Sequence, residues 1–220
     1  FKDFDFEQHQ EYITKLYENA PEYEISDFKN TTLNSIYKEA NIKMTKIPNA
    51  PGAQSVGIFI NNDDDDIIIK VLETNNRSNY GKSKIITETY WMVHLYNLGL
   101  SPEFKSLQCI KLKHKGKIFI QCIVRLRKHK TFKEYYHEQY SNDSTPDIIY
   151  KQIKENAIMK NMFEKLLEKF NKRKYYVMQD FHLNNVVMSL DEEEILTIDC
   201  IPEENSTKRN SFENIIFHFT

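Results

Sequence analysis

The segment Tyr176–Met188 constrains the fold of this chain more than any other stretch. Its sequence is YVMQDFHLNNVVM, in which Asp180 and Asn185 are separated by four residues and an apolar run follows Asn185 directly. A second apolar run, residues 195–198, ends in Asp199. Asp and Asn are common turn residues, so each position alone carries little weight. The three together predict short apolar strands that carry polar groups at their ends.

The composition is that of a folded chain, large enough for one domain or for two small lobes that share a cleft. Over 220 residues, 40% are hydrophobic and 28% are charged, which provides enough apolar material for a core. A formal net charge of −2 gives no overall attraction to a polyanion, so a nucleic-acid site would have to be local. No apolar run approaches the roughly 20 residues of a membrane span, and we predict none.

The cysteines argue against a metal centre. Cys109, Cys122 and Cys200 are widely spaced, odd in number and form no C-x-x-C pair. We predict that they are reduced, buried thiols of a cytosolic protein.

The hydrophobic periodicity changes from helical to strand-like near residue 42. The predicted helices cover residues 6–17, 33–40, 83–99, 131–137, 147–172 and 212–219. The predicted strands cover residues 42–47, 56–60, 67–72, 107–112 and 118–124. The last two strands are expected to form a hairpin about Lys115-Gly116-Lys117.

This order of elements, with the D-x-x-x-x-N pattern and the later Asp199, resembles the protein kinase superfamily over roughly residues 42–200. In that family a strand of the small lobe ends in a lysine and the next helix carries a glutamate. Here Lys70 closes the apolar run of residues 67–69, and Glu88 lies eighteen residues further on. The resemblance implies that these two side chains pair and align the nucleotide phosphates.

The same resemblance implies roles for the remaining candidate residues. Asp180 would orient or deprotonate the acceptor hydroxyl, and Asn185 and Asp199 would hold Mg²⁺ against the phosphates of ATP. Gly52 and Gly57 stand where the first and last glycines of the phosphate-covering loop would stand, and the middle glycine is missing.

Several positions depart from the kinase pattern. Met178-Gln179 replaces the His-Arg before the catalytic Asp, which predicts activity that does not depend on a phosphorylated activation loop. His182 is similar to haspin and to the aminoglycoside and choline kinases. Cys200-Ile201 replaces Phe-Gly after Asp199, and only 21 residues follow Asp199. This compactness is similar to the truncated effector kinases of enteric pathogens and to RIO-type kinases.

We therefore expect an α+β protein with a two-lobed, kinase-like fold: a small antiparallel β-sheet lobe with one key helix, and a reduced, mainly helical large lobe. The expected divisions are a helical extension (1–41), the small lobe (42–126) and a truncated large lobe (127–220). The expected function is that of a minimal Ser/Thr protein kinase that uses ATP and Mg²⁺. Two alternatives stay open, a small-molecule phosphotransferase on the same fold and a pseudokinase that acts as a binding module.

The expected partner is a protein substrate or a regulatory protein, in the cytoplasm, or in the host-cell cytoplasm for a pathogen effector. The basic stretch Lys111–Lys133 lacks the interleaved aromatic residues of a base-stacking surface. We expect it to be a solvated face or a docking patch for an acidic protein, and we do not expect a nucleic-acid partner. The acidic segment Asp63–Asp66 lacks the spacing of a calcium loop and is expected to be a hairpin turn.

Overall fold

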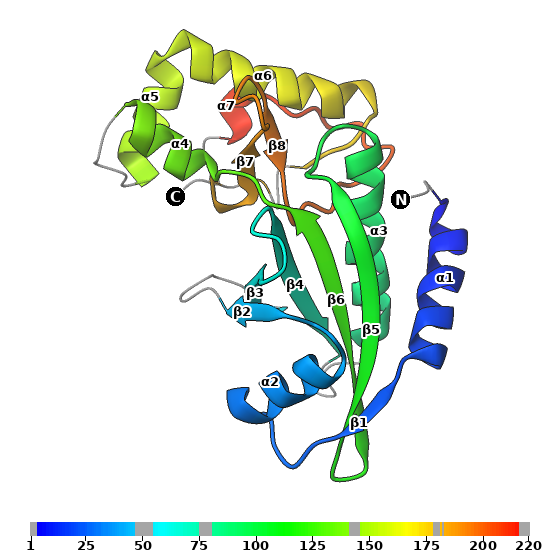
Figure 1. The fold of residues 1–220 in the computed structure, drawn as a ribbon. Helices are drawn as coiled ribbons and strands as arrows, with labels where there is room; N and C mark the ends of the chain where they lie inside the picture. The colour runs from blue at the N-terminus through cyan, green and yellow to red at the C-terminus, as the bar shows by residue number, and fades with distance from the viewer. Residues whose placement is uncertain are drawn as a thin grey trace. The chain divides into compact units, whose positions relative to one another are not determined.

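The computed structural model describes residues 4–46, 55–74, 81–140, 146–177, 181 and 183–215. These residues form a mixed α/β protein that divides into two compact units (Figure 1). Unit 1 comprises Phe1–His94 and Glu103–Lys128, and unit 2 comprises Leu95–Pro102 and His129–Thr220.

Unit 1 is built on a six-stranded sheet with the order β1-β5-β6-β4-β3-β2. Its strands are β1 (Glu22–Glu24), β2 (Met44–Lys46), β3 (Ser55–Asn61), β4 (Ile67–Glu73), β5 (Phe104–His114) and β6 (Lys117–Arg127). The neighbouring strands pair in antiparallel fashion, as predicted, in β2–β3, β3–β4, β4–β6 and β6–β5. The pair β1–β5 is parallel, and it adds to this sheet a strand from residues 1–41 that was not predicted.

The hairpin of β5 and β6 is longer than its apolar runs predicted, with 11 residues in each strand. It turns at Lys115 and Gly116, whose φ values are +48° and +76°. Positive φ at both central residues is the geometry of the type I′ turn, whose twist matches that of antiparallel strands. The turn fixes the register of the hairpin, beginning with His114 opposite Lys117.

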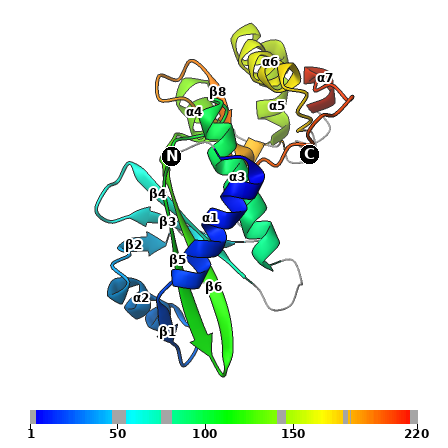
Figure 2. The same cartoon turned by 90° about the vertical axis from the view of Figure 1, so that its right-hand side faces the viewer.

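Helices cover both faces of this sheet (Figures 1 and 2). On one face, α2 (Asn30–Glu39) contributes Leu33, Ile36 and Tyr37 to a core that includes Ile69 and Val71 of β4. Side chains alternate along a strand, so the residues between these face the other side. That side is covered by α1 (Phe6–Asn19) and α3 (Gly81–Asn97).

The first 41 residues are therefore not only helical. The strand β1 lies between α1 and α2, and its residues Glu22, Tyr23 and Glu24 align with Lys111, Leu112 and Lys113 of β5. This strand was not predicted, because three residues after a proline show no periodicity. The acidic segment Asp63–Asp66 forms the predicted turn between β3 and β4.

Unit 2 contains the remaining elements. They are α4 (Phe132–Gln139), α5 (Pro146–Glu155), α6 (Ala157–Lys172), the short 3₁₀ helix η1 (Leu183–Asn185), β7 (Val186–Met188), β8 (Ile195–Thr197) and α7 (Phe212–Ile215). Phe163 of α6 lies at the centre of an aromatic cluster, with ring-centroid distances of 5.2 Å to Phe132, 6.2 Å to Phe181 and 6.4 Å to Phe212. The rings of Phe163, Phe132 and Phe181 are fully buried.

The single helix predicted over residues 147–172 is wrong. The helix is interrupted at Asn156, whose φ and ψ of −93° and 111° are those of an extended residue. Its side-chain oxygen accepts hydrogen bonds from the backbone N–H groups of Ile158 and Met159, at 2.9 and 3.1 Å. Asn is a strong N-cap residue because it satisfies N–H groups that the helix itself leaves open, so α6 begins here as a separate helix.

Among the helices of the described residues, none has the length and apolar character needed to cross a membrane.

Candidate active site

Lys70 lies on β4, the third strand of the meander β2-β3-β4. It pairs with Ile58 of β3 and Val124 of β6. Its neighbours Ile69 and Val71 are fully buried in the core on the α2 side, so Lys70 faces the α1 and α3 side and is half-buried there. An ammonium group on such a strand requires interaction partners, and Lys70 is engaged in the structure.

Glu88 lies on α3, the helix that joins β4 to β5, and is half-buried. The next residue, Thr89, is fully buried and fixes this part of the helix. The Thr89 hydroxyl donates to the carbonyl of Ile85 at 2.8 Å and lies 2.9 Å from Nε2 of His9 on α1. Glu88 therefore sits on a turn of helix whose buried side is tied to α1.

His9 was missed by the sequence analysis. The hydroxyl of Thr89 has one hydrogen, which it donates to a backbone carbonyl, so Nε2 of His9 must carry the proton and donate to Thr89. Nδ1 of His9 is then a buried acceptor that has no hydrogen-bond partner among the described residues. Desolvation lowers the pKa of His9 to about 4. The signal in the sequence was its helical spacing from Ile13 and Tyr17 on the apolar face of α1.

The predicted phosphate loop is described only at its end. Gly52 lies outside the described residues. The backbone of Gly57 lies in β3, opposite Val71 of β4, next to a shift of register between Ser55 and Gly57. A glycine at such an irregularity is typical of a bulge or of close approach by another backbone or ligand.

Asn185 and Asp199 lie at one end of the two-stranded ribbon of β7 and β8. Asn185 ends η1 and leads into β7, and Asp199 follows β8 by two residues. Val186 pairs with Thr197, and the N–H of Ile198 donates to the carbonyl of Asn185 at 2.9 Å. The antiparallel register thus places the two predicted metal ligands beside each other although they are 14 positions apart in the sequence.

Asp199 has an unusual backbone. Its φ of +54° lies in the left-handed region, which non-glycine residues enter rarely and Asp more often than most. Its side chain is exposed and that of Asn185 is half-buried. Such conformations concentrate at binding and catalytic sites, where the surrounding structure holds them. The predicted catalytic residue Asp180 lies outside the described residues, as does His182.

The chemistry of Asn185 and Asp199 fits Mg²⁺. An amide oxygen and a carboxylate are hard oxygen donors, and Mg²⁺ is commonly held by one or two protein groups together with phosphates and water. In the part of the chain that the structure describes, no cluster of three or more His, Cys, Asp or Glu side chains is placed to hold a metal ion on its own.

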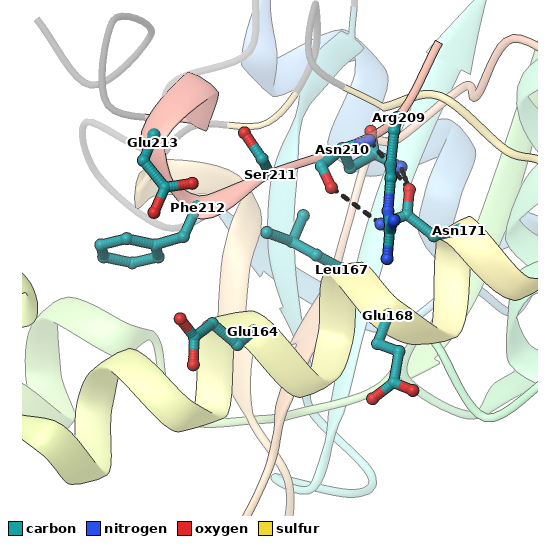
Figure 3. Close-up of a pocket in the computed structure, with 9 residues that line it drawn as sticks. All are labelled: Glu164, Leu167, Glu168, Asn171, Arg209, Asn210, Ser211, Phe212 and Glu213. Atoms are coloured by element: carbon teal, nitrogen blue, oxygen red, sulfur yellow. Dashed lines mark hydrogen bonds between the residues drawn. The ribbon is translucent and has the colours of Figure 1, made fainter. Parts of the chain in front are cut away.

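A separate groove of about 370 Å³ lies in unit 2 between α6 and the segment before α7 (Figure 3). It is lined by Glu164, Leu167, Glu168, Asn171, Arg209, Asn210, Ser211, Phe212 and Glu213. Asn171 and Asn210 bond reciprocally: the side-chain amide of Asn171 donates to the Asn210 carbonyl at 2.7 Å and its oxygen accepts from the Asn210 N–H at 2.8 Å. These bonds attach the C-terminal segment to α6. None of the predicted site residues that the structure describes lines the groove.

No protein-family model and no curated protein matches the chain. Among solved structures, the chain is similar to the LegK7 effector kinase of Legionella pneumophila, with a TM-score of 0.36 and 15% identity. That match covers 88% of this chain and 37% of the other. It is also similar to the LegK7 chain solved in complex with human MOB1A, with a TM-score of 0.37, 13% identity and coverage of 87% and 33%.

The chain thus spans about a third of the length of these kinases. Similarity at this level assigns neither an activity nor a site to this chain.

Proposed function

We propose that this chain is a minimal protein-kinase-type phosphotransferase that uses ATP and Mg²⁺ and transfers the γ-phosphate to a hydroxyl group of a protein. The observation that carries the proposal is the position of Asn185 and Asp199 at one end of the β7–β8 ribbon. An amide oxygen and a carboxylate at one end of a hydrogen-bonded ribbon are hard oxygen donors of the kind that Mg²⁺ prefers.

In this proposal Asn185 and Asp199 hold Mg²⁺ through their side-chain oxygens. The bound cation neutralises charge on the phosphate oxygens, which is the main requirement of phosphoryl transfer. The ribbon would contribute rigidity, because the bond from the Ile198 N–H to the Asn185 carbonyl and the pairing of Val186 with Thr197 hold the backbone beside both residues. Rigid ligands keep the phosphates in a fixed position for the transfer.

Lys70 and Glu88 supply the second part of the proposal. A half-buried lysine between two fully buried strand residues is stable when anionic groups surround it. We assign that role to the carboxylate of Glu88 and, when nucleotide is bound, to its phosphate oxygens. Thr89 and His9 would act through Glu88, because they fix the turn of α3 on which it lies.

Asp180 is the proposed catalytic residue, which accepts or orients the hydroxyl hydrogen of the acceptor. Gly52 and Gly57 are proposed to let backbone N–H groups approach the phosphates without a Cβ atom in the way. The proposal requires the Lys70 and Glu88 pair, the Asn185 and Asp199 pair and Asp180 to act on one nucleotide.

The protein acceptor, the Ser/Thr preference and a protein partner are proposals that follow from the kinase resemblance. The division into an extension (1–41), a small lobe (42–126) and a truncated large lobe (127–220) is likewise proposed. A cytoplasmic location, in a host cell for an effector, belongs to the same proposal.

The test measures phosphate transfer and nucleotide binding with the full chain. The protein is incubated with γ-labelled ATP and Mg²⁺, with and without a generic protein substrate. Asp180→Ala and Lys70→Ala are compared with the unchanged chain, and Asp199→Asn is compared with Asp191→Asn. Asp191 lies in the connection at the opposite end of the ribbon, where its carboxylate accepts hydrogen bonds from Ser189 and Glu193, and serves as the matched control.

We expect label on protein from the unchanged chain and from Asp191→Asn, and no label from Asp180→Ala or Lys70→Ala. Asp199→Asn should lose the gain in nucleotide affinity that Mg²⁺ gives, which calorimetry with ATP and with Mg·ATP measures directly. Binding of ATP without any transfer would overturn the catalytic part of the proposal. Phosphate transfer to a small molecule alone would overturn the proposal of a protein acceptor. The absence of ATP binding would overturn the whole proposal.

A further inference from the structure

Two thiols of unit 1 face each other across the β5–β6 hairpin. Cys109 of β5 lies directly opposite Cys122 of β6, and their Sγ atoms are 3.0 Å apart. Both cysteines are free thiols in the structure. Residues directly opposite on antiparallel strands have Cα atoms about 4.5–5.5 Å apart, which lies within the range of about 4.4–6.8 Å that a disulfide needs. The two strands therefore already hold the backbone geometry of a cross-link.

The hairpin turn determines this pairing. Lys115 and Gly116 form the turn and align His114 with Lys117, and the same register continues without a shift to Cys109 and Cys122. A regular ladder on both sides of the pair means that only the two side chains have to rotate for a bond to form. The pairing is therefore a rigid property of the hairpin.

Helix α1 covers the pair. The hydroxyl oxygen of Tyr17 lies 3.7 Å from Sγ of Cys122, and Cys109, Cys122 and Tyr17 are 4%, 0% and 4% exposed. The hydrogen bond with the Cys122 thiol, and then burial, raise the pKa of the Cys109 thiol, which keeps it protonated and unreactive while it is covered. Access to the pair therefore requires α1 to move away from the sheet, and its contact with Thr89 through His9 is one of the bonds that hold it there.

We propose that Cys109 and Cys122 are a peroxide-sensitive dithiol that forms a cross-strand disulfide, and that Tyr17 of α1 is the lid that limits its oxidation. One thiolate attacks hydrogen peroxide, so that its sulfur is oxidised to a sulfenic acid while one peroxide oxygen leaves and is protonated to water. The second thiol attacks that sulfur, the S–S bond forms, and the sulfenic oxygen leaves as a second water. In total, two thiols and one peroxide give one disulfide and two waters.

This site is independent of the proposed phosphate transfer. The cross-link would join β5 to β6, the strand next to β4, and would fix the part of the sheet that α1 covers. A reductant would regenerate the two thiols, so the modification is reversible.

The test uses the full chain, first reduced and then exposed to hydrogen peroxide at neutral pH without denaturant. Trypsin separates the two cysteines into the peptides 106–111 and 118–125, so a disulfide between them gives one linked peptide in a non-reducing digest. The intact protein should lose two hydrogen masses and two of its three thiols. Cys109→Ser and Cys122→Ser should each abolish the linked peptide, and Cys200→Ser should leave it unchanged.

The lid is tested by the rate at which the linked peptide forms. Tyr17→Ala should accelerate formation several-fold, whereas Tyr17→Phe keeps the ring over the pair and should change the rate little. Phe28→Ala is the matched control, because Phe28 packs on Phe119 and His114 near the turn of the same hairpin. Far-UV circular dichroism shows which variants are folded, and Cys109→Ser against Cys200→Ser still tests the pair if Tyr17→Ala does not fold.

Formation of the 106–111 to 118–125 link in the folded chain, and its reversal by a thiol reductant, are the expected results. The proposal is overturned if the link forms only in denaturant or if peroxide consumes Cys200 first. Equal rates for Tyr17→Ala and the unchanged chain would overturn the role of α1 as the lid.

Discussion

Acidification should weaken unit 1 through the side chain of His9 on α1. This imidazole is 1% exposed and donates from Nε2 to Thr89 at 2.9 Å, and no group in the described part of the chain bonds to its Nδ1. A second proton would have to enter at Nδ1, where the charge would be buried without an acceptor. Desolvation accordingly lowers the pKa of His9 from 6.5 to about 4.

The sign and size of the effect follow from this difference. Between pH 6.5 and about 4 the unfolded chain binds a proton at His9 that the folded chain does not bind, so stability falls as the pH falls. The contribution of His9 is fully present above pH 6.5 and is lost near pH 4. A difference of about 2.5 pKa units corresponds to roughly 3 kcal/mol of unfolding free energy.

The assay is urea unfolding followed by the fluorescence of Trp91. It is the one tryptophan of the chain, lies on α3 and is 5% exposed, so it reports on unit 1. The matched variant is His9→Gln, whose amide can donate to Thr89 and does not titrate. From about pH 7.5 to about pH 4.5 we expect the unchanged chain to lose roughly 2–3 kcal/mol more than His9→Gln. Parallel profiles for the two proteins would refute the argument, because all other titrating groups are common to both.

Three further predictions concern local structure, each measured by urea unfolding with circular dichroism. Asn156→Ala should cost about 1 kcal/mol because α6 loses its N-cap, and Asn156→Asp should retain most of the stability; equal loss in both would contradict the cap. Phe163→Ala should cost about 3–5 kcal/mol, because the ring is fully buried among three other aromatic rings. Ile158→Ala on the same helix is the control, since Ile158 is 61% exposed and its loss should change little. Gly116→Ala should cost about 1 kcal/mol through its φ of +76°, since the added methyl would contact nothing within 4 Å; an unchanged stability would show that the turn rearranges.

The sequence alone determined the elements whose signals are local. The strands of the meander, the helix between β4 and β5 and the hairpin about Lys115 and Gly116 follow from periodicity and from turn residues. Thr131 and Glu134 form a capping box, in which the Thr131 hydroxyl accepts from the Glu134 N–H at 3.1 Å and the Glu134 carboxylate accepts from the Thr131 N–H at 2.8 Å. These features depend on residues within a few positions of one another, so a sequence pattern contains them.

The tertiary structure decided what depends on distant partners. Strand β1 forms because Glu22–Glu24 pairs with the edge of β5, nearly 90 residues later in the chain. Its own three residues have no periodicity that predicts a strand. Asn156 divides the apolar pattern of residues 147–172 because an N-cap bond outweighs a periodicity that continues through it.

The tertiary structure also decided which chemically reactive or metal-binding side chains lie near one another. The sequence supplied Asn185 and Asp199 as candidates, and the antiparallel register of β7 and β8 made them neighbours. It also supplied Cys109, Cys122 and His9, but their environments come from the register of one hairpin and from the packing of α1 on α3. Residue type fixes what a side chain can do chemically, whereas pairing and burial fix which groups it meets, because both depend on contacts between segments far apart in the chain.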